Sequence, residues 1–106
     1  MSTESTQPVA NRPVGQAMIR HEGGLHARPS IKVTKLSKRF QSQVWIGLSS
    51  EGPWTDAKSI ARVMAMKTPI NTTIYFSAEG GDAESAVKAL VALVTDDFAD
   101  TPGDAG

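Results

Sequence analysis

Residues 23–40 read GGLHARPSIKVTKLSKRF, and this stretch passes from a loop into a helix. The two glycines predict a turn. From Ala27 onward the apolar side chains recur with a helical period and share one face, at Pro29, Val33, Leu36 and Phe40. The pattern predicts a helix that buries this face, whereas Ile31 falls on the opposite side and is expected at the surface.

Alternating apolar residues before and after this helix predict four short strands, at residues 14–20, 43–48, 54–57 and 72–78. In the second strand the alternation directs Val44, Ile46 and Leu48 inward and leaves Trp45 on the other side. Each strand therefore has one apolar face, and a sheet built from them needs one covering layer.

Two further helices are expected, one after Ser59 and one after Asp82, with these two residues as their N-caps. The resulting order is β-α-β-β-α-β-α. Three amphipathic helices can cover one face of the sheet and leave the other face wet. The sequence thus predicts an α+β open-faced sandwich.

The composition allows one domain. The chain has 106 residues, of which 40% are hydrophobic. Residues 1–13 and 99–106 are rich in small and polar residues and are expected to form disordered tails around a domain of residues 14–98. The N-terminus lacks the basic and apolar regions of a secretory signal, and no stretch has the ~18 apolar residues of a membrane span.

Charge and cysteine content exclude several classes of function. Eleven basic and 11 acidic side chains balance to a net charge of zero, which disfavours nucleic-acid binding. The chain has no cysteine, so a disulfide scaffold, a thiolate zinc site and a thiol nucleophile are excluded. A small chain held together by packing alone fits a cytoplasmic protein.

The residues with chemical potential lie where the first helix begins. His26 is expected at the helix N-terminus, where unpaired backbone N–H groups and the helix dipole favour an anion. Arg28 is in the first turn, an unfavourable place for a cation unless it meets a bound phosphate, which a guanidinium grips with two N–H groups. Pro29 is tolerated there because a first-turn N–H has no partner to lose.

An imidazole is nucleophilic near pH 7, and its phosphorylated form is reactive enough to hand the group on. The simpler alternative is that His26 is an ordinary helix-start residue and Arg28 a surface cation. The complete segment GLHARP favours a phosphoryl carrier over this alternative.

GLHARP followed by a helix resembles the phosphorylatable-histidine motif of the HPr family, the histidine-containing phosphocarriers of the bacterial phosphotransferase system. The segment DAKSI, residues 56–60, resembles the regulatory-serine segment of the same family, and element order and spacing agree over most of residues 14–98. The resemblance implies a four-stranded antiparallel sheet with three helices.

The resemblance also implies specific partners and roles. Enzyme I would phosphorylate His26 on Nδ1 with a phosphoryl group from phosphoenolpyruvate, and a IIA protein or domain would accept it. Arg28 matches the phosphate-facing arginine of the family, and Ser59 its regulatory serine, the target of HPr kinase/phosphorylase where that enzyme is present. The long segment LSSEGPWTDA and the acidic DDFAD near the C-terminus look more like the nitrogen-related branch.

A docking surface is expected around His26. Ile31, off the buried face, could combine with exposed apolar residues of the short second helix, and the candidate contacts are Ala27, Ile31, Ile60, Ala61 and Met64. Methionine suits a surface that accepts more than one partner.

Several of these residues also have simpler explanations. Ser59 can be explained as an N-cap alone. His21 is expected to be a solvated loop residue, and with His26 it lacks the further ligands of a metal site, so neither metal nor cofactor is expected. The chain is expected to be a monomer and to act as a stoichiometric carrier, not as an enzyme. It is not expected to bind nucleic acid or a membrane. The alternative is a regulatory binding module that passes no phosphoryl group onward.

Overall fold

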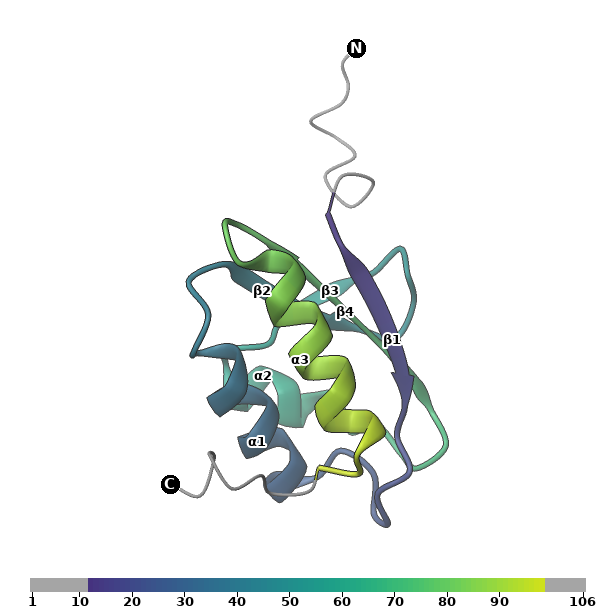
Figure 1. Ribbon diagram of the computed structural model, residues 1–106. Coiled ribbons are helices and arrows are strands. Elements are labelled where there is room, and N and C mark those ends of the chain that lie inside the picture. Colours follow the sequence, from purple (N-terminus) through teal and green to yellow (C-terminus); the bar gives the residue numbers. More distant parts are fainter. Residues whose placement is uncertain (1–11, 99–106) are drawn as a thin grey trace.

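A computed structural model describes residues 12–98 of the chain. The elements are β1 (Val14–Met18), α1 (Ala27–Ser37), β2 (Gln43–Gly47), β3 (Trp54–Asp56), α2 (Ile60–Ala65), β4 (Thr73–Glu79) and α3 (Ala83–Thr95). The strands form one antiparallel sheet in the order β1-β4-β2-β3, and the helices lie on one side of it (Figure 1). The predicted element order and the open-faced α+β sandwich are confirmed.

The strand register gathers the apolar side chains on the helix-covered face. Ala17 pairs with Ile74, and Ile46 pairs with Phe76, so that these side chains form neighbouring rows. All four are buried against the helices. In α1 the predicted face is also confirmed, because Val33 is fully buried, and the rest of that face is buried or packs against the core.

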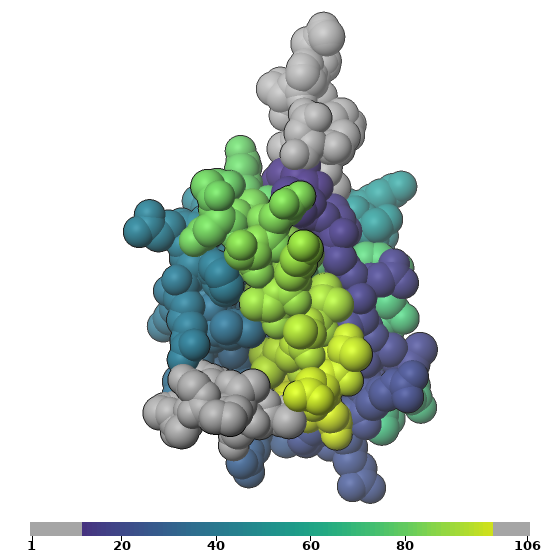
Figure 2. All heavy atoms as spheres, in the orientation of Figure 1, coloured from purple at the N-terminus to yellow at the C-terminus, as the bar shows by residue number. Residues whose placement is uncertain are grey.

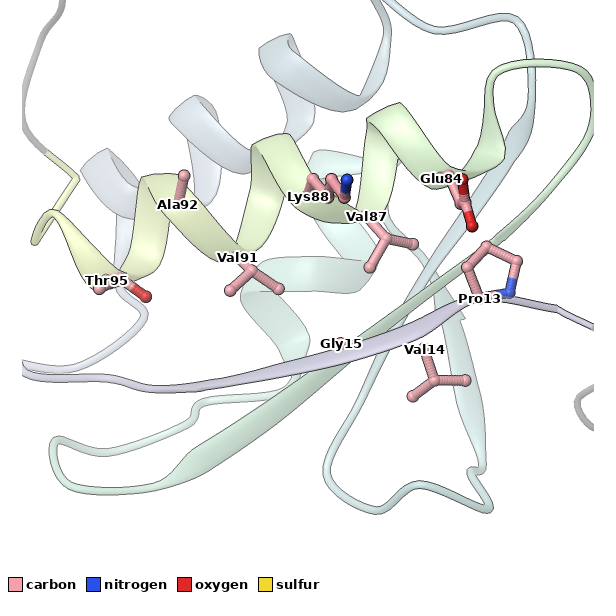
Figure 3. A pocket seen from close by; sticks show the side chains of 9 residues that line it. All are labelled: Pro13, Val14, Gly15, Glu84, Val87, Lys88, Val91, Ala92 and Thr95. Atoms are coloured by element: carbon pink, nitrogen blue, oxygen red, sulfur yellow. The ribbon is translucent and has the colours of Figure 1, made fainter.

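The last helix lies close to the first strand. Val87 and Val91 of α3 point toward β1 at Gly15 (Figure 3). A Cβ atom on Gly15 would lie 2.8 Å from Val87 Cγ1 and 2.7 Å from Val91 Cγ2. Only a residue without a side chain allows this approach, so Gly15 lets α3 pack directly on the edge strand.

Two expectations about the sheet are wrong. Leu48 is 52% exposed, because β2 ends at Gly47 and the chain turns there toward β3, so the alternation does not continue. Trp45 does lie on the face away from the helices, but it is half-buried rather than wet. The guanidinium of Arg12 lies 4.1 Å from the centre of its ring, a cation–π contact that covers it.

Asp82 has a different role from the predicted one. It stands at the N-cap position of α3, yet its side chain makes no capping hydrogen bond. Its carboxylate instead accepts hydrogen bonds from the backbone N–H groups of Gln41 (3.0 Å) and Ser42 (2.9 Å) and from the Ser42 hydroxyl. These bonds, with that of the Ser42 hydroxyl foremost, favour the charged carboxylate and hold the pKa of Asp82 below its usual value. Asp82 therefore links the start of α3 to the loop before β2.

The predicted tails at residues 1–13 and 99–106 lie outside the described residues, apart from Arg12 and Pro13. No helix within residues 12–98 has the length and apolar character needed to cross a membrane.

Candidate phosphoacceptor site

His26 is the N-cap residue of α1, but its side chain does not form the usual capping hydrogen bond. Its backbone is extended (φ −91°, ψ −163°), and its carbonyl oxygen accepts the first helical hydrogen bond, from the N–H of Ser30 at 2.9 Å. The imidazole makes no capping hydrogen bond, and the residue is exposed. The ring nitrogens are therefore open to a reaction partner.

The first turn of α1 presents few but well-placed donors. Ser30 uses its N–H on His26, and Pro29 has none, so the N–H groups of Ala27 and Arg28 are the ones left without a helical acceptor. No acidic side chain lies in this turn, and Arg28 is exposed. The helix dipole, two amides and a guanidinium thus favour an anion beside the imidazole.

The loop before His26 is anchored from both sides. The N–H of Leu25 donates to the carbonyl oxygen of Thr68 at 2.8 Å, and the Ser30 hydroxyl donates to the carbonyl oxygen of Leu25 at 3.3 Å. Leu25 itself is buried. The side chain before His26 is therefore fixed in the core, and this sets the direction in which the imidazole leaves the surface.

The predicted glycine turn has a steric reason at each position. Gly24 has φ +75°, and a Cβ atom there would lie 2.3 Å from the Thr68 carbonyl oxygen, so any other residue would push the loop off its anchor. Gly23 has φ +91°, and a Cβ atom there would lie 2.9 Å from His26 Cδ2. The two glycines make room for the anchor and for the ring of His26.

His21 is not the solvated residue that the sequence predicted. It is half-buried, and its ring lies edge-on to Phe98, with 5.8 Å between the ring centres. The ring centre of His26 is 5.1 Å away. The glycine turn allows this because it folds the chain back, with the N–H of Gly24 donating to the carbonyl oxygen of His21. The sign of this proximity in the sequence is the five-residue spacing of the two histidines across Gly23-Gly24.

Ser59 caps α2 as predicted. Its hydroxyl accepts a hydrogen bond from the N–H of Arg62 at 3.3 Å. The side chain of Lys58 donates to the carbonyl oxygen of Phe40, beyond the C-terminal end of α1, at 2.8 Å. The other end of α2 is followed by Thr68, which holds the loop at the start of α1. Contacts thus link the start of α2 to the chain beyond the C-terminal end of α1, and the segment after α2 to the loop before His26.

The five candidate docking residues are all at the surface of α1 and α2. Ile31 is 46% exposed, Met64 41% and Ile60 36%, and Ala27 and Ala61 are exposed as well. Ala27 directly follows His26, Ile60 and Ala61 directly follow Ser59, and α1 packs against α2. The candidate surface thus extends from the helix start at His26 to the cap of α2.

The part of the chain that the structure describes holds no group of three or more His, Asp and Glu side chains arranged for a metal ion. His21 also uses Nδ1 in a hydrogen bond to the carbonyl oxygen of Glu22 at 2.9 Å.

Comparison with known proteins agrees with this geometry. Residues 15–96 match the sequence model of a family described as the PTS HPr component phosphorylation site. The chain belongs to the HPr family. Proteins of this family are phosphocarriers of the phosphotransferase system rather than enzymes in the usual sense, which agrees with the resemblance.

Individual members of the HPr family support the assignment. The phosphocarrier protein HPr of Cupriavidus necator is 43% identical over 75 residues, which cover 71% of this chain and 82% of that protein. A crystal structure of HPr from Thermoanaerobacter tengcongensis superposes with a TM-score of 0.74 at 34% identity, covering 81% of this chain and 94% of that one. A four-stranded sheet with three helices is therefore the fold of the family.

Several relatives are much longer than this chain. The multiphosphoryl transfer protein of Haemophilus influenzae is 37% identical over 90 residues, which are 84% of this chain but only 18% of that protein. The chain thus corresponds to a single segment of a larger phosphoryl-transfer protein in that case. The nitrogen-related branch stays a prediction.

Proposed function

We propose that this HPr-family chain accepts a phosphoryl group on His26 from Enzyme I, which takes it from phosphoenolpyruvate, and passes it to a IIA protein or domain. The observation that carries the proposal is the exposed, uncapped imidazole at the N-terminus of α1. The unpaired amides of Ala27 and Arg28 and the Arg28 side chain belong to the same helix end, where they favour a bound anion.

The proposed step is a direct displacement at phosphorus. The lone pair of Nδ1 of His26 attacks while the ring proton stays on Nε2, so a new N–P bond forms. The bond between phosphorus and the donor breaks, and its electron pair stays on the donor. Onward transfer is the same step with His26 as the leaving group, so the carrier regains its neutral ring. No general base is required, which fits a carrier without a substrate pocket.

The helix end supplies electrostatic stabilisation during this step. The amides of Ala27 and Arg28 point out of the helix and would donate to phosphoryl oxygens, and the Arg28 guanidinium would neutralise part of the charge. Because no acidic side chain lies in the first turn, this positive potential is not cancelled locally.

Arg28→Ala is expected to slow transfer without unfolding the protein. A charge-assisted hydrogen bond to phosphate contributes about 1.5–3 kcal/mol, so the rate should fall roughly 10- to 150-fold. Rapid-quench measurements with phosphorylated Enzyme I would give the rate constant. Arg28→Lys is the matched control, since it keeps the charge but loses the two-pronged contact, and its rate should lie between the two. Wild-type kinetics in Arg28→Ala would show that the backbone amides suffice.

Ile31→Asp is expected to weaken binding to Enzyme I by tenfold or more and to change the free energy of unfolding by less than about 0.5 kcal/mol. The reason is that Ile31 is exposed on α1, where a charge costs little in the free carrier but resists burial against a partner. Titration calorimetry and urea unfolding measure the two quantities.

Leu48→Asp is the matched control for Ile31→Asp. Leu48 is just as exposed but follows β2, away from the two helices. It should leave binding unchanged. Equal losses in both variants would contradict a docking surface on α1 and α2.

The direct test of the function is a transfer assay. The chain is incubated with Enzyme I and phosphoenolpyruvate, and ³¹P NMR follows the appearance of a phosphohistidine signal. A purified IIA protein is then added, and the signal should move to it. Label that appears on His26 but never leaves would instead support the alternative, a regulatory module. Absence of any phosphohistidine would refute both.

Regulation through Ser59 is part of the proposal, with HPr kinase/phosphorylase as the modifying enzyme. Its support is the position of Ser59 beside Ile60 and Ala61 at one end of the docking surface. The cytoplasmic location and the monomeric state stay predictions.

A further inference from the structure

The ring of His21 is held beside the candidate phosphoacceptor by a contact outside the GLHARP segment. Its edge-on contact with Phe98 connects it to the end of α3, where Phe98 is buried and its N–H donates to the carbonyl oxygen of Leu93 at 2.8 Å. Figures 1 and 2 show the segment between β1 and α1 lying beside the end of α3. His21 is therefore a positioned side chain.

The hydrogen bond of His21 defines which nitrogen carries its proton. Nδ1 lies 2.9 Å from the carbonyl oxygen of Glu22, and because a carbonyl oxygen only accepts, Nδ1 must donate. In the neutral ring, Nε2 then has a lone pair and no proton. Only the protonated ring has an N–H at Nε2 as well, together with a positive charge.

We infer that His21 takes up a proton when His26 is phosphorylated, and that the resulting imidazolium stabilises the phosphoryl group. This inference rests on the proposed function of His26. A phosphoryl group carries about 1.5–2 negative charges near pH 7. The charge would be carried on a ring whose centre lies 5.1 Å from that of His21, and it would favour the charged form of His21.

The consequence for the carrier follows from linkage. Phosphorylation raises the proton affinity of His21, so the phosphorylated form holds more protons in the interval between the two titration midpoints. At pH values below this interval the His21 imidazolium stabilises the phosphoryl group fully, and at pH values above it this stabilisation is lost. The phosphorylated carrier is thus favoured as the pH falls, and it gives up its group more readily as the pH rises.

Other charged groups lie on the elements around His21, namely Arg20 and Glu22 in the loop, Arg28 in α1, and Asp96 and Asp97 beside Phe98. They are present with and without phosphate on His26. The influence of Arg20, Glu22, Asp96 and Asp97 on the proton affinity of His21 therefore largely cancels in a comparison of the two states. Arg28 would neutralise part of the phosphoryl charge, so it reduces the effect of the phosphoryl group on His21 without reversing it.

The test is an NMR titration of both states. The chain has only two histidines, so long-range ¹H–¹⁵N spectra resolve each ring, and ³¹P NMR reports independently whether His26 is phosphorylated. In the phosphorylated protein the titration midpoint of His21 should rise by about half to one pH unit. A phosphohistidine signal with an unchanged His21 midpoint would overturn this inference and leave the proposed function standing. No phosphohistidine signal would overturn both.

A variant separates electrostatics from packing. In His21→Gln the site cannot take up this proton. Between pH 8 and pH 6, the ratio of phosphorylated to free carrier in equilibrium with Enzyme I should therefore change by a factor that is smaller than in the wild type by about threefold or more. Phe98→Leu, which loosens the edge contact but keeps His21, is the control and should retain the wild-type pH profile more closely. Identical pH profiles in His21→Gln and wild type would contradict the inference.

Discussion

His26→Ala is expected to fold like the wild type and to accept no phosphoryl group from Enzyme I. The imidazole is exposed and makes no capping hydrogen bond, so its loss should change the free energy of unfolding by less than about 0.5 kcal/mol. Without its lone pair no N–P bond can form at the helix end. Phosphorylation by Enzyme I and phosphoenolpyruvate should fall below detection, and thermal unfolding would verify the fold.

His21→Gln is the matched control for this variant, because His21 is the other histidine of the chain and its ring lies beside His26. It should still be phosphorylated. Acid-labile phosphate on His26→Ala would mean that another side chain, with His21 first in line, is the acceptor. The pair of variants thus assigns the modified ring.

Ser59→Asp is expected to raise the apparent KM for the carrier in the Enzyme I reaction by about tenfold or more, with the melting temperature held or raised. Aspartate is as good an N-cap as serine, and a negative charge at a helix N-terminus is favourable, so the fold should not suffer. Ser59 caps α2, whereas His26 stands at the start of α1, so the two residues belong to different helix ends. The damage should fall on docking over Ile60 and Ala61, where burying a charge is costly.

Ser59→Asn is the matched control, since asparagine also caps helices but carries no charge. It should keep a KM close to that of the wild type, and the effect of Ser59→Asp should weaken as salt is added if repulsion contributes. A changed kcat with an unchanged KM would contradict an effect on docking. Wild-type behaviour of Ser59→Asp would reduce Ser59 to its capping role.

Many structural features of this protein are determined by residues that are close together in the sequence. The buried face of α1, the exposure of Ile31 and the cap at Ser59 depend on residues within a few positions of one another, and side-chain periodicity records such relations directly. The position of His26 at a helix start follows in the same way from GLHARP. The wrong predictions concern residues whose environment depends on contacts with segments distant in the sequence. Leu48 continues the alternating pattern, but it is exposed because the chain turns after β2. Asp82 precedes a helix, but its carboxylate accepts hydrogen bonds from a loop 40 residues earlier.

Tertiary structure decided what surrounds the candidate phosphoacceptor. The anchor between Leu25 and Thr68, the contact of His21 with Phe98 and the packing of α1 against α2 join segments that are distant in the sequence. Periodicity within one element gives no account of which other element packs against it, because that choice depends on how all the apolar faces are buried together. For this reason the sequence could propose His26 as the reactive residue, whereas its histidine neighbour came only with the fold.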